Sequence, residues 1–365
     1  MVAAARHDAI LRELELRGSL GNTGFARRLG VTSMTLRRDV EDLHRRGLLV
    51  RVHGGAVSLA VAQQQAADAD GYGPRRPRPV ATIGMIVPTT EYYFPEVIRG
   101  ASRAAAEANC RLVVGATNYS PDEELRQARR MLESGVDGLL ITPHGALEAD
   151  SSLLQVLRDA RVPIVLVERD AEDRVQDLFA MVRSDHAYGA ELGIRHLVAL
   201  GHRRIALATR PSATASGLDE GFRRGMVAVG EDGFALRGAL SDPPVGERVA
   251  AAGLGAFLDE CVEKQVTAVM LLGDADSMAF TELVLARGLR IPEDMAVIAY
   301  DDEVASLAAV PLTAVAPLKR DLGRSAVRLC VDQLRRVRGD SGTVVRSVLM
   351  PELVVRESTI VREFV

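Results

Sequence analysis

The sequence has few cysteines, few aromatic residues and no long apolar run. Its three cysteines, Cys110, Cys261 and Cys330, lie far apart, and none belongs to a C-x-x-C pair or stands near a histidine cluster. This pattern argues against a disulfide framework and is typical of thiols in a reducing cytosol. No apolar stretch approaches the length that spans a bilayer, and the N-terminus lacks a signal-peptide pattern. We therefore expect a cytoplasmic protein that does not bind membranes.

Familiar catalytic and cofactor motifs are also missing. Gly253-Leu254-Gly255 lies inside a helical pattern, follows no strand and lacks the third glycine of a dinucleotide fingerprint. There is no G-x-S-x-G, no Walker motif and no histidine pair with metal-ligand spacing. His202 precedes an expected strand instead of following one, so we interpret it as structural. The sequence thus predicts no enzyme, no cofactor and no metal site.

The distribution of charge is more informative than its total. With 365 residues, 47% hydrophobic and 26% charged, the chain has the composition of an ordinary soluble protein of two or three domains. The net charge is −4, but residues 1–57 contain ten arginines and six acidic residues, a net +4 that leaves −8 for the rest. This basic N-terminal segment, the head, on an otherwise acidic chain indicates a protein that contacts phosphate groups through the head only.

The basic head contains an expected helix with two different faces. Thr32 can cap it, and Leu36, Val40 and Leu43 form an apolar stripe. A charged opposite face is usually only solvated. Here two shorter apolar patterns precede the helix, and alternation over 50–53 ending in Gly54-Gly55 follows it, which together favour a helix-turn-helix with a basic wing.

The run V-T-S-M-T-L-R-R-D-V (31–40), followed by G-L-L-V-R-V-H-G-G-A (47–56), resembles the winged helix-turn-helix of DeoR-type bacterial transcription regulators. The resemblance covers about residues 5–57 and makes 1–57 a DNA-binding domain. It implies that double-stranded operator DNA is a partner. The residues expected at the DNA, with the capping residue, are Thr32, Ser33, Met34, Thr35, Arg37, Arg38, Arg51 and His53.

A Gly- and Pro-rich linker is expected at 58–80, and the remaining sequence predicts an α/β fold. Short apolar runs alternate with longer amphipathic ones, which indicates parallel sheets covered by helices on both faces and divided between two lobes. Ligands of such sheets bind at the carboxyl ends of the strands. The expected strands are 82–87, 111–115, 138–142, 164–167, 179–183, 205–209, 268–272 and 296–300. The expected helices are 95–108, 122–134, 187–200, 246–263, 277–287 and 322–336.

Several segments resemble the sensor domain of LacI/GalR-type repressors, among them I-G-M-I-V-P (83–88), G-H-R-R-I-A (201–206), A-Y-D-D (299–302) and P-E-L-V-V-R-E-S (351–358). The resemblance implies a type I periplasmic-binding-protein-like domain at 81–362 and a homodimer. It places one lobe at about 81–182 and 318–346, and the other at about 183–316 and 347–362. Crossovers are thus expected near 183, 316 and 347. The linker shows no pattern of the short hinge helix of these repressors.

Candidate ligand-binding residues lie near expected strand ends and crossovers. Tyr92, Tyr93 and Phe94 are consecutive in a chain with only 4% aromatic residues, and each could pack either on a sugar ring or a base or at the edge of a lobe. By position within the family, Tyr93 and Phe94 are preferred. Carboxylates and arginines can bind polyols through charge-assisted hydrogen bonds, although a surface charge or a helix cap would look the same. The full set is Tyr93, Phe94, Glu168, Arg183, Asp185, Arg210, Thr214, Asp274, Asp276 and Asp301.

Three positions depart from sugar-binding relatives. Leu218 stands where arginine is common, Ala275 where asparagine is usual, and Pro317 where glutamine is common, so a common hexose is not assumed. The resemblance implies a ligand-responsive transcription regulator, more specifically a repressor, whose small effector is sugar-like or nucleoside-like. A solute-binding protein is opposed by the missing signal peptide and the DNA-binding head, and a metabolite-converting enzyme by the missing motifs.

Overall fold

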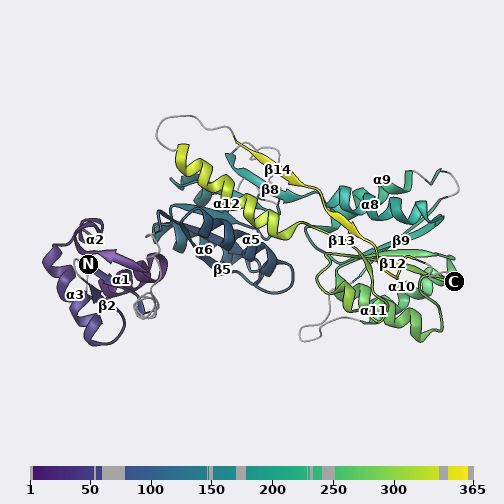
Figure 1. The fold of residues 1–365 in the computed structure, drawn as a ribbon, viewed down its shortest axis with the longest axis horizontal. Helices are drawn as coiled ribbons and strands as arrows, with labels where there is room; N and C mark the ends of the chain where they lie inside the picture. Colours follow the sequence, from purple (N-terminus) through teal and green to yellow (C-terminus); the bar gives the residue numbers. More distant parts are fainter. Residues whose placement is uncertain are drawn as a thin grey trace, which may run out of the picture.

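The chain folds into a small head and two α/β lobes, as the computed structural model in Figure 1 shows. The structure describes residues 3–52, 55–59, 79–145, 147, 151–169, 178–227, 229–230, 233–240, 251–336 and 344–360. Within these ranges, no helix is both long and apolar enough to cross a membrane. The predicted fold class, a winged head followed by parallel sheets with covering helices, is confirmed.

The head is a helix-turn-helix with a three-stranded wing. Leu36, Val40 and Leu43 are at most 1% exposed and pack in its core, as the apolar stripe predicts. The antiparallel strands have the order β1-β3-β2. Strand β1 was not expected, because its three residues follow Gly18 and resemble a turn. The elements are α1 (Ala3–Arg17), β1 (Ser19–Gly21), α2 (Asn22–Arg28), α3 (Ser33–Arg45), β2 (Val50–Val52) and β3 (Gly55–Val57).

The first lobe is a six-stranded parallel sheet between two pairs of helices. The strand order is β14-β8-β7-β6-β4-β5. Helices α5 and α12 bury their apolar sides on one face, and α6 and α7 on the other. The strands are β4 (Ala81–Val87), β5 (Cys110–Ala116), β6 (Gly138–Ile141), β7 (Ile164–Val167), β8 (Ala180–Ser184) and β14 (Arg346–Leu349). The helices are α5 (Phe94–Glu107), α6 (Pro121–Glu133), α7 (Ser152–Asp159) and α12 (Lys319–Arg336).

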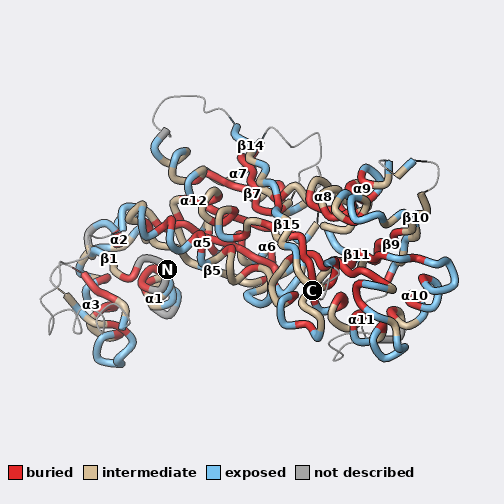
Figure 2. The backbone as a smooth tube through the Cα atoms, turned by 45° about the vertical axis from the view of Figure 1, so that its right-hand side comes forward, coloured by how far each residue is buried: buried red, intermediate tan, exposed pale blue. Residues whose placement is uncertain are grey.

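The second lobe repeats this arrangement with the order β10-β9-β11-β12-β13-β15, in which only β15 is antiparallel to its neighbour. Helices α8 and α9 cover one face, and α10 and α11 the other. Figure 2 shows inner strands of both lobes, such as β7 and β11, as buried segments inside more exposed helices. The strands are β9 (Arg204–Thr209), β10 (Phe234–Ala239), β11 (Ala268–Leu272), β12 (Ala296–Tyr300), β13 (Thr313–Ala316) and β15 (Glu352–Val354). The helices are α8 (His186–Ala199), α9 (Ala215–Val227), α10 (Ala251–Glu263), α11 (Asp274–Ala286) and the short η3 (Ala305–Leu307).

The chain passes between the lobes three times, at slightly different places from those expected. Strand β8 continues to Ser184 and β14 to Leu349 within the first sheet, so the first and third passages follow these residues, close to the expected positions near 183 and 347. The second follows Ala316, at the end of β13. Strand β14 itself was not expected, because it is a half-exposed edge strand without a continuous apolar run. The expected linker lies mostly outside the described residues, as does the beginning of the helix expected from 246.

Two glycines let α5 and α12 cross at close range. A Cβ atom at Gly100 would overlap the main-chain carbonyl oxygen of Arg320, and one at Gly323 would overlap that of Val97. Only glycine avoids both overlaps. The close crossing holds the beginning of α12, and with it Lys319, next to the beginning of α5, where the two lobes meet.

Candidate functional site

The outer face of α3 presents Met34, Arg37 and Arg38 to solvent. Thr32 caps the helix by accepting a hydrogen bond from the main-chain N–H of Thr35 at 3.1 Å, and the two threonine hydroxyls lie 2.9 Å apart. Met34 is 62% exposed. Arg37 and Arg38 are exposed and make no hydrogen bond or ion pair with any described residue. The beginning of α3 thus offers one apolar side chain and two free guanidinium groups to a partner.

Asp39 fixes the rotation of this helix. Its carboxylate is buried and accepts hydrogen bonds from Arg6 Nε at 2.7 Å and from Arg6 Nη2 at 3.0 Å, while His7 Nε2 lies 3.3 Å away. These contacts tie α3 to α1. Because Asp39 points inward, its neighbours Arg37 and Arg38 are held on the outer side, where DNA can reach them.

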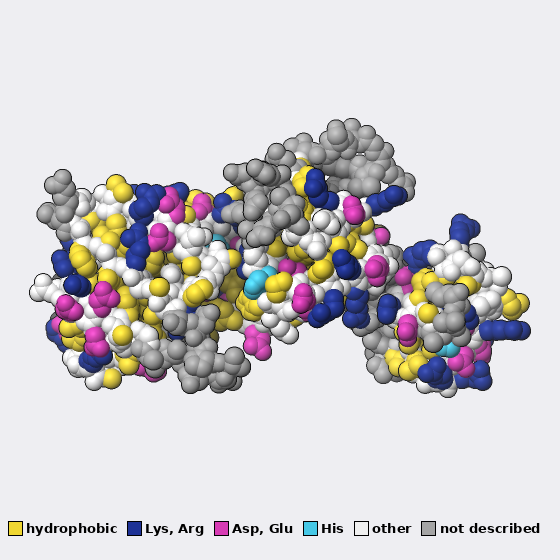
Figure 3. All heavy atoms as spheres, turned by 180° about the vertical axis from the view of Figure 1, so that it is seen from behind, with side chains coloured by type: hydrophobic (Ala, Val, Ile, Leu, Met, Phe, Trp, Pro, Cys, Tyr) yellow, Lys and Arg dark blue, Asp and Glu magenta, His cyan; other side chains and the backbone are white. Residues whose placement is uncertain are grey.

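The wing is tied to the same helix. Arg51 on β2 donates a hydrogen bond to Glu41 on α3, and both side chains are about half exposed. An exposed pair of this kind is weak, so Glu41 does not commit Arg51 to this contact. Figure 3 shows basic side chains projecting from the head. His53, the other expected wing contact, lies outside the described residues, and Ser33 is half-buried at the beginning of α3.

Between the lobes, Glu168 is the centre of a buried hydrogen-bond network. It follows β7 with a left-handed backbone, φ 56°, and accepts hydrogen bonds from the Ser184 main-chain N–H at 2.9 Å, from Ser184 Oγ at 2.7 Å and from the Tyr93 hydroxyl. His186 Nε2 lies 3.6 Å away. Burial opposes ionisation, but these partners lower the pKa of Glu168 to about 2. Glu168 therefore orients Tyr93 and His186 at the place where the two lobes meet.

Asp274, another expected ligand-binding residue, has a structural role in the second lobe. Its fully buried carboxylate accepts hydrogen bonds from four consecutive main-chain N–H groups, those of residues 302–305, at 2.6 to 3.2 Å. These bonds hold the loop after β12 against the beginning of α11. Burial nevertheless raises the pKa of Asp274.

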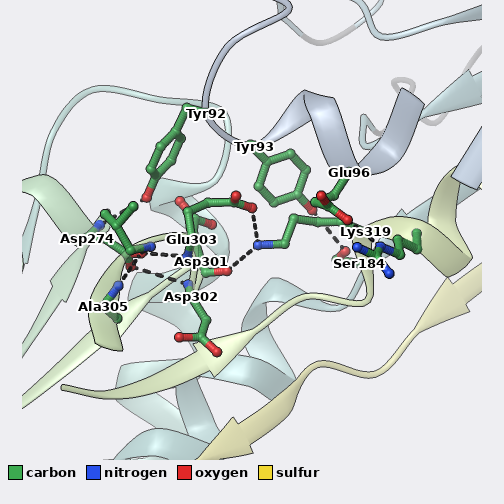
Figure 4. Close-up of polar contacts among 12 residues, drawn as sticks. Tyr92, Tyr93, Glu96, Ser184, Asp274, Asp301, Asp302, Glu303, Ala305 and Lys319 are labelled. Carbon is green, nitrogen blue, oxygen red and sulfur yellow. Dashed lines mark hydrogen bonds and ion pairs between the residues drawn. The ribbon is translucent and has the colours of Figure 1, made fainter. Parts of the chain in front are cut away.

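Two side chains of the first lobe reach across to the second lobe, one to the beginning of α11 and one to the loop after β12 (Figure 4). The Tyr92 hydroxyl accepts a hydrogen bond from the main-chain N–H of Asp274 at 3.0 Å. Lys319 donates from Nζ to the carbonyl oxygen of Asp301 and to the carboxylate of Glu303, and its Nζ lies 5.4 Å from the centre of the Tyr93 ring. The lobes are therefore joined by direct contacts around Asp301.

Asp301 is buried in the middle of these contacts. Its φ of 105° is rare for a residue with a side chain, and strained backbones of this kind cluster at functional sites. Burial raises the pKa of Asp301 to about 7, against the opposing effect of Lys319. The side chain thus changes its charge near neutral pH, as expected for a group placed to interact with a ligand.

Replacing Asp301 with asparagine is expected to flatten the pH dependence of stability. Between about pH 4 and 7 the folded protein holds a proton on Asp301 that the unfolded chain has released, so the free energy of unfolding falls as pH rises through this window. Asp301→Asn removes this loss, which is on the order of a few kcal/mol, and should be more stable than the wild type at pH 8. Urea unfolding from pH 4 to pH 8 measures the effect. Parallel profiles for the two proteins would contradict it.

Arg210 and Asp276 form a buried pair in the second lobe. Arg210 donates from Nε to Oδ2 of Asp276 at 2.6 Å and from Nη2 to Oδ1 at 2.8 Å, and the side chains are only 15% and 9% exposed. The remaining nitrogen, Nη1, is buried and has no hydrogen-bond partner within the described part of the chain. Because an unmet buried donor is costly, this nitrogen indicates a place for a ligand oxygen.

The structure also places the other residues expected in the cleft, namely Phe94, Asp185, Arg183 and Thr214. Phe94 is 4% exposed in the core of the first lobe and meets the edge of Tyr93, so it supports that ring instead of facing a ligand. Asp185 caps α8 by accepting a hydrogen bond from the Tyr188 main-chain N–H at 2.9 Å. Arg183 donates to the carbonyl oxygen of Ser184 at 3.2 Å, and half-buried Thr214 immediately precedes α9.

Sequence reasoning missed a polar cluster at the carboxyl ends of β5, β6 and β7. The Tyr119 ring lies edge-on to His144 at 6.2 Å, and Glu124 accepts the His144 main-chain N–H at 2.9 Å. Burial raises the pKa of Glu124 to about 7. Arg169 donates to the carbonyl oxygen of Glu168 at 2.7 Å, while its Nε is buried without a partner among the described residues. Their position after strand ends was the available signal. Lys319 and His186 were also missed, although both adjoin crossovers.

The three departures from sugar-binding relatives are visible in the structure. Leu218 is completely buried in the core beneath α9, Pro317 is buried at the second crossover, and Ala275 is exposed at the beginning of α11. None of them offers a side-chain hydrogen bond. Polar groups do lie nearby in sequence: Arg210 follows β9, and Asp276 lies in the first turn of α11, which follows the neighbouring strand β11. Within the described residues, no group of three or more potential ligands is arranged to hold a metal ion.

Known protein families match the head and the two-lobed part of the chain separately. Residues 6–61 match the DeoR-like helix-turn-helix domain, and residues 194–359 match the periplasmic binding protein-like domain. The HTH-type transcriptional regulator CelR of Thermobifida fusca is 30% identical over 335 residues, which cover 86% of this chain and 94% of CelR. The arabinose metabolism transcriptional repressor of Geobacillus stearothermophilus is 24% identical over 351 residues, covering 92% and 89%. The structure of a CelR–cellobiose complex has a TM-score of 0.62 at 27% identity and covers 91% of this chain and 98% of its own.

A helix-turn-helix head joined to a two-lobed sensor fold defines a DNA-binding transcriptional regulator that responds to a small molecule. The chain belongs to the LacI/GalR-type transcriptional regulators and carries a DeoR-like DNA-binding head. Both resemblances predicted from the sequence are therefore confirmed.

Proposed function

We propose that this regulator is a cytoplasmic, homodimeric repressor whose effector is an uncharged, polyhydroxylated metabolite, sugar-like or nucleoside-like. The observation that carries the proposal is Arg210, whose Nη1 is buried and without a partner while Asp276 holds the rest of the guanidinium group. A ligand hydroxyl can accept from Nη1. The same ligand hydroxyl can donate a hydrogen bond to a carboxylate such as that of Asp301.

The charge balance of the cleft favours an uncharged ligand. Arg210 is neutralised by Asp276 and Lys319 by Glu303. Asp301 and Glu124, with pKa values raised to about 7, would repel a phosphate or a carboxylate whenever they ionise. CelR, which was solved with cellobiose, is a relative with a sugar ligand, and this supports the same class here.

The effector acts in this proposal by changing the contacts between the lobes. Tyr92, Lys319 and His186 link the lobes directly and lie around Asp301. A ligand bound among them stabilises one lobe arrangement over another, and this changes the spacing of the two heads of a dimer on a pseudo-palindromic operator. Arg37, Arg38, Arg51 and His53 would contact DNA, with Thr32, Ser33, Met34 and Thr35 at the helix beginning.

A thermal-shift screen tests the effector class. Pentoses, hexoses, disaccharides, polyols and nucleosides are compared with their phosphates and with sugar acids. An effector at about 100 times its Kd stabilises the folded protein by roughly 2.7 kcal/mol, which is readily detected. We expect hits among the uncharged compounds, and a hit should change the affinity for operator DNA. Hits confined to phosphates or sugar acids would contradict the proposed class.

The compound identified in the thermal-shift screen also tests the alternative that the protein is an enzyme. After prolonged incubation with the protein, chromatography should return the compound unchanged, whereas conversion would show catalysis.

Sedimentation of the full chain, with and without operator DNA, tests the homodimer. A monomer bound to a single half-site would rule out the homodimer.

A further inference from the structure

Met34 is an exposed apolar side chain in the middle of the DNA-facing surface. It is 62% exposed, and it precedes Arg37 by three residues and Arg38 by four, so all three share one face of α3. Single exposed apolar residues are common and by themselves indicate nothing. Here, however, the two neighbours on the face are arginines that have no partner within the described chain.

The rest of the first turn is occupied by the helix cap. The hydroxyls of Thr32 and Thr35 lie 2.9 Å apart, and Thr32 also accepts the Thr35 main-chain N–H. Ser33 is half-buried. Met34 is therefore the side chain of this turn that projects freely, and the Asp39–Arg6 contacts hold the helix in the rotation that presents it.

Among the four base pairs, only those with thymine present an apolar group in the major groove, the C5-methyl group. The other base edges there are hydrogen-bond donors and acceptors, which a thioether side chain satisfies poorly. We infer that Met34 is a specificity-determining residue that selects thymine at one position of each operator half-site. The inference rests on the DNA-binding role of α3, and it adds which chemical feature of the DNA is read.

Uracil, which is thymine without this methyl group, provides the test. A duplex selected from a random pool by the full-length protein is the probe, and each of its thymines is replaced in turn by deoxyuridine. We expect one thymine per half-site at which uracil weakens binding about fourfold, the worth of one buried methyl group. In Met34→Ala this penalty should disappear, whereas Met34→Leu should retain it.

Binding of the unmodified duplex checks the DNA-binding role separately. If the wild type selects no duplex, or binds without salt dependence, the regulatory function itself fails. If the wild type binds but tolerates uracil at every position, or if Met34→Ala keeps the wild-type penalty, the assignment of Met34 is overturned while DNA binding stands.

Discussion

Replacing Arg37 and Arg38 together with alanine is expected to weaken operator binding by about a hundredfold or more. Each arginine is exposed on the face of α3 that Asp39 turns outward, and neither has a partner among the described residues that would compete with DNA. An arginine that contacts a base or phosphate contributes on the order of 1–3 kcal/mol. If both contact phosphates, the slope of log affinity against log salt should also fall by about 2. Fluorescence anisotropy over a series of salt concentrations measures both quantities.

A control with the same change in net charge separates contact from general electrostatics. Arg103→Ala with Arg223→Ala also removes two positive charges, but these residues lie on α5 and α9, where they pair with Glu107 and Glu220. This variant should bind the operator nearly as well as the wild type. Effector binding, measured by thermal shift, should be unchanged in both variants. An equal loss of DNA affinity in the two would count against a direct role for Arg37 and Arg38.

The sequence predicted buried strands well, because each is a continuous apolar run. Strands β7, β11 and β12 have their expected bounds, since they lie inside a sheet covered on both faces. Of the four missed strands in the lobes, β10, β14 and β15 lie at sheet edges, where one side is open and the apolar signal weakens. The fourth, β13, lies inside its sheet, but its four residues, T-A-V-A, are too short and too small to form a clear apolar run. The head was predicted almost completely, because its cap, apolar stripe and wing are local in sequence.

The cleft was predicted less well, because the role of each side chain depends on distant main-chain groups. Asp274 and Asp301 look alike in sequence, each an aspartate after a buried strand. Only the folded loop 302–305 shows that Asp274 is occupied by four N–H groups. Lys319 lies at the beginning of a helix of the first lobe, and its contact with the second lobe follows from the crossover and not from any local pattern.

Replacing Arg210 with glutamine is expected to weaken effector binding by about ten- to a hundredfold. The reason is the loss of a charge-assisted hydrogen bond from Nη1, worth roughly 1.5–3 kcal/mol. The variant should also be less stable, since the buried carboxylate of Asp276 loses both of its donors. Isothermal titration with the effector found in the thermal-shift screen, together with urea unfolding, measures the two effects on the same protein.

A second substitution separates the two roles of Arg210. In Arg210→Gln with Asp276→Asn, two amides replace the ion pair and no buried charge is left alone, so stability should largely return while effector affinity stays low. Arg290 and Asp294 form a matched pair with the same two-bond geometry, at 2.8 Å and 2.8 Å, but on the exposed surface of the same lobe. Arg290→Gln should alter neither property. Recovery of both effector affinity and stability in the double variant would show that Arg210 only supports the lobe. The ligand oxygen would then bind elsewhere. The next group to test would be Nε of Arg169, which is buried without a partner among the described residues.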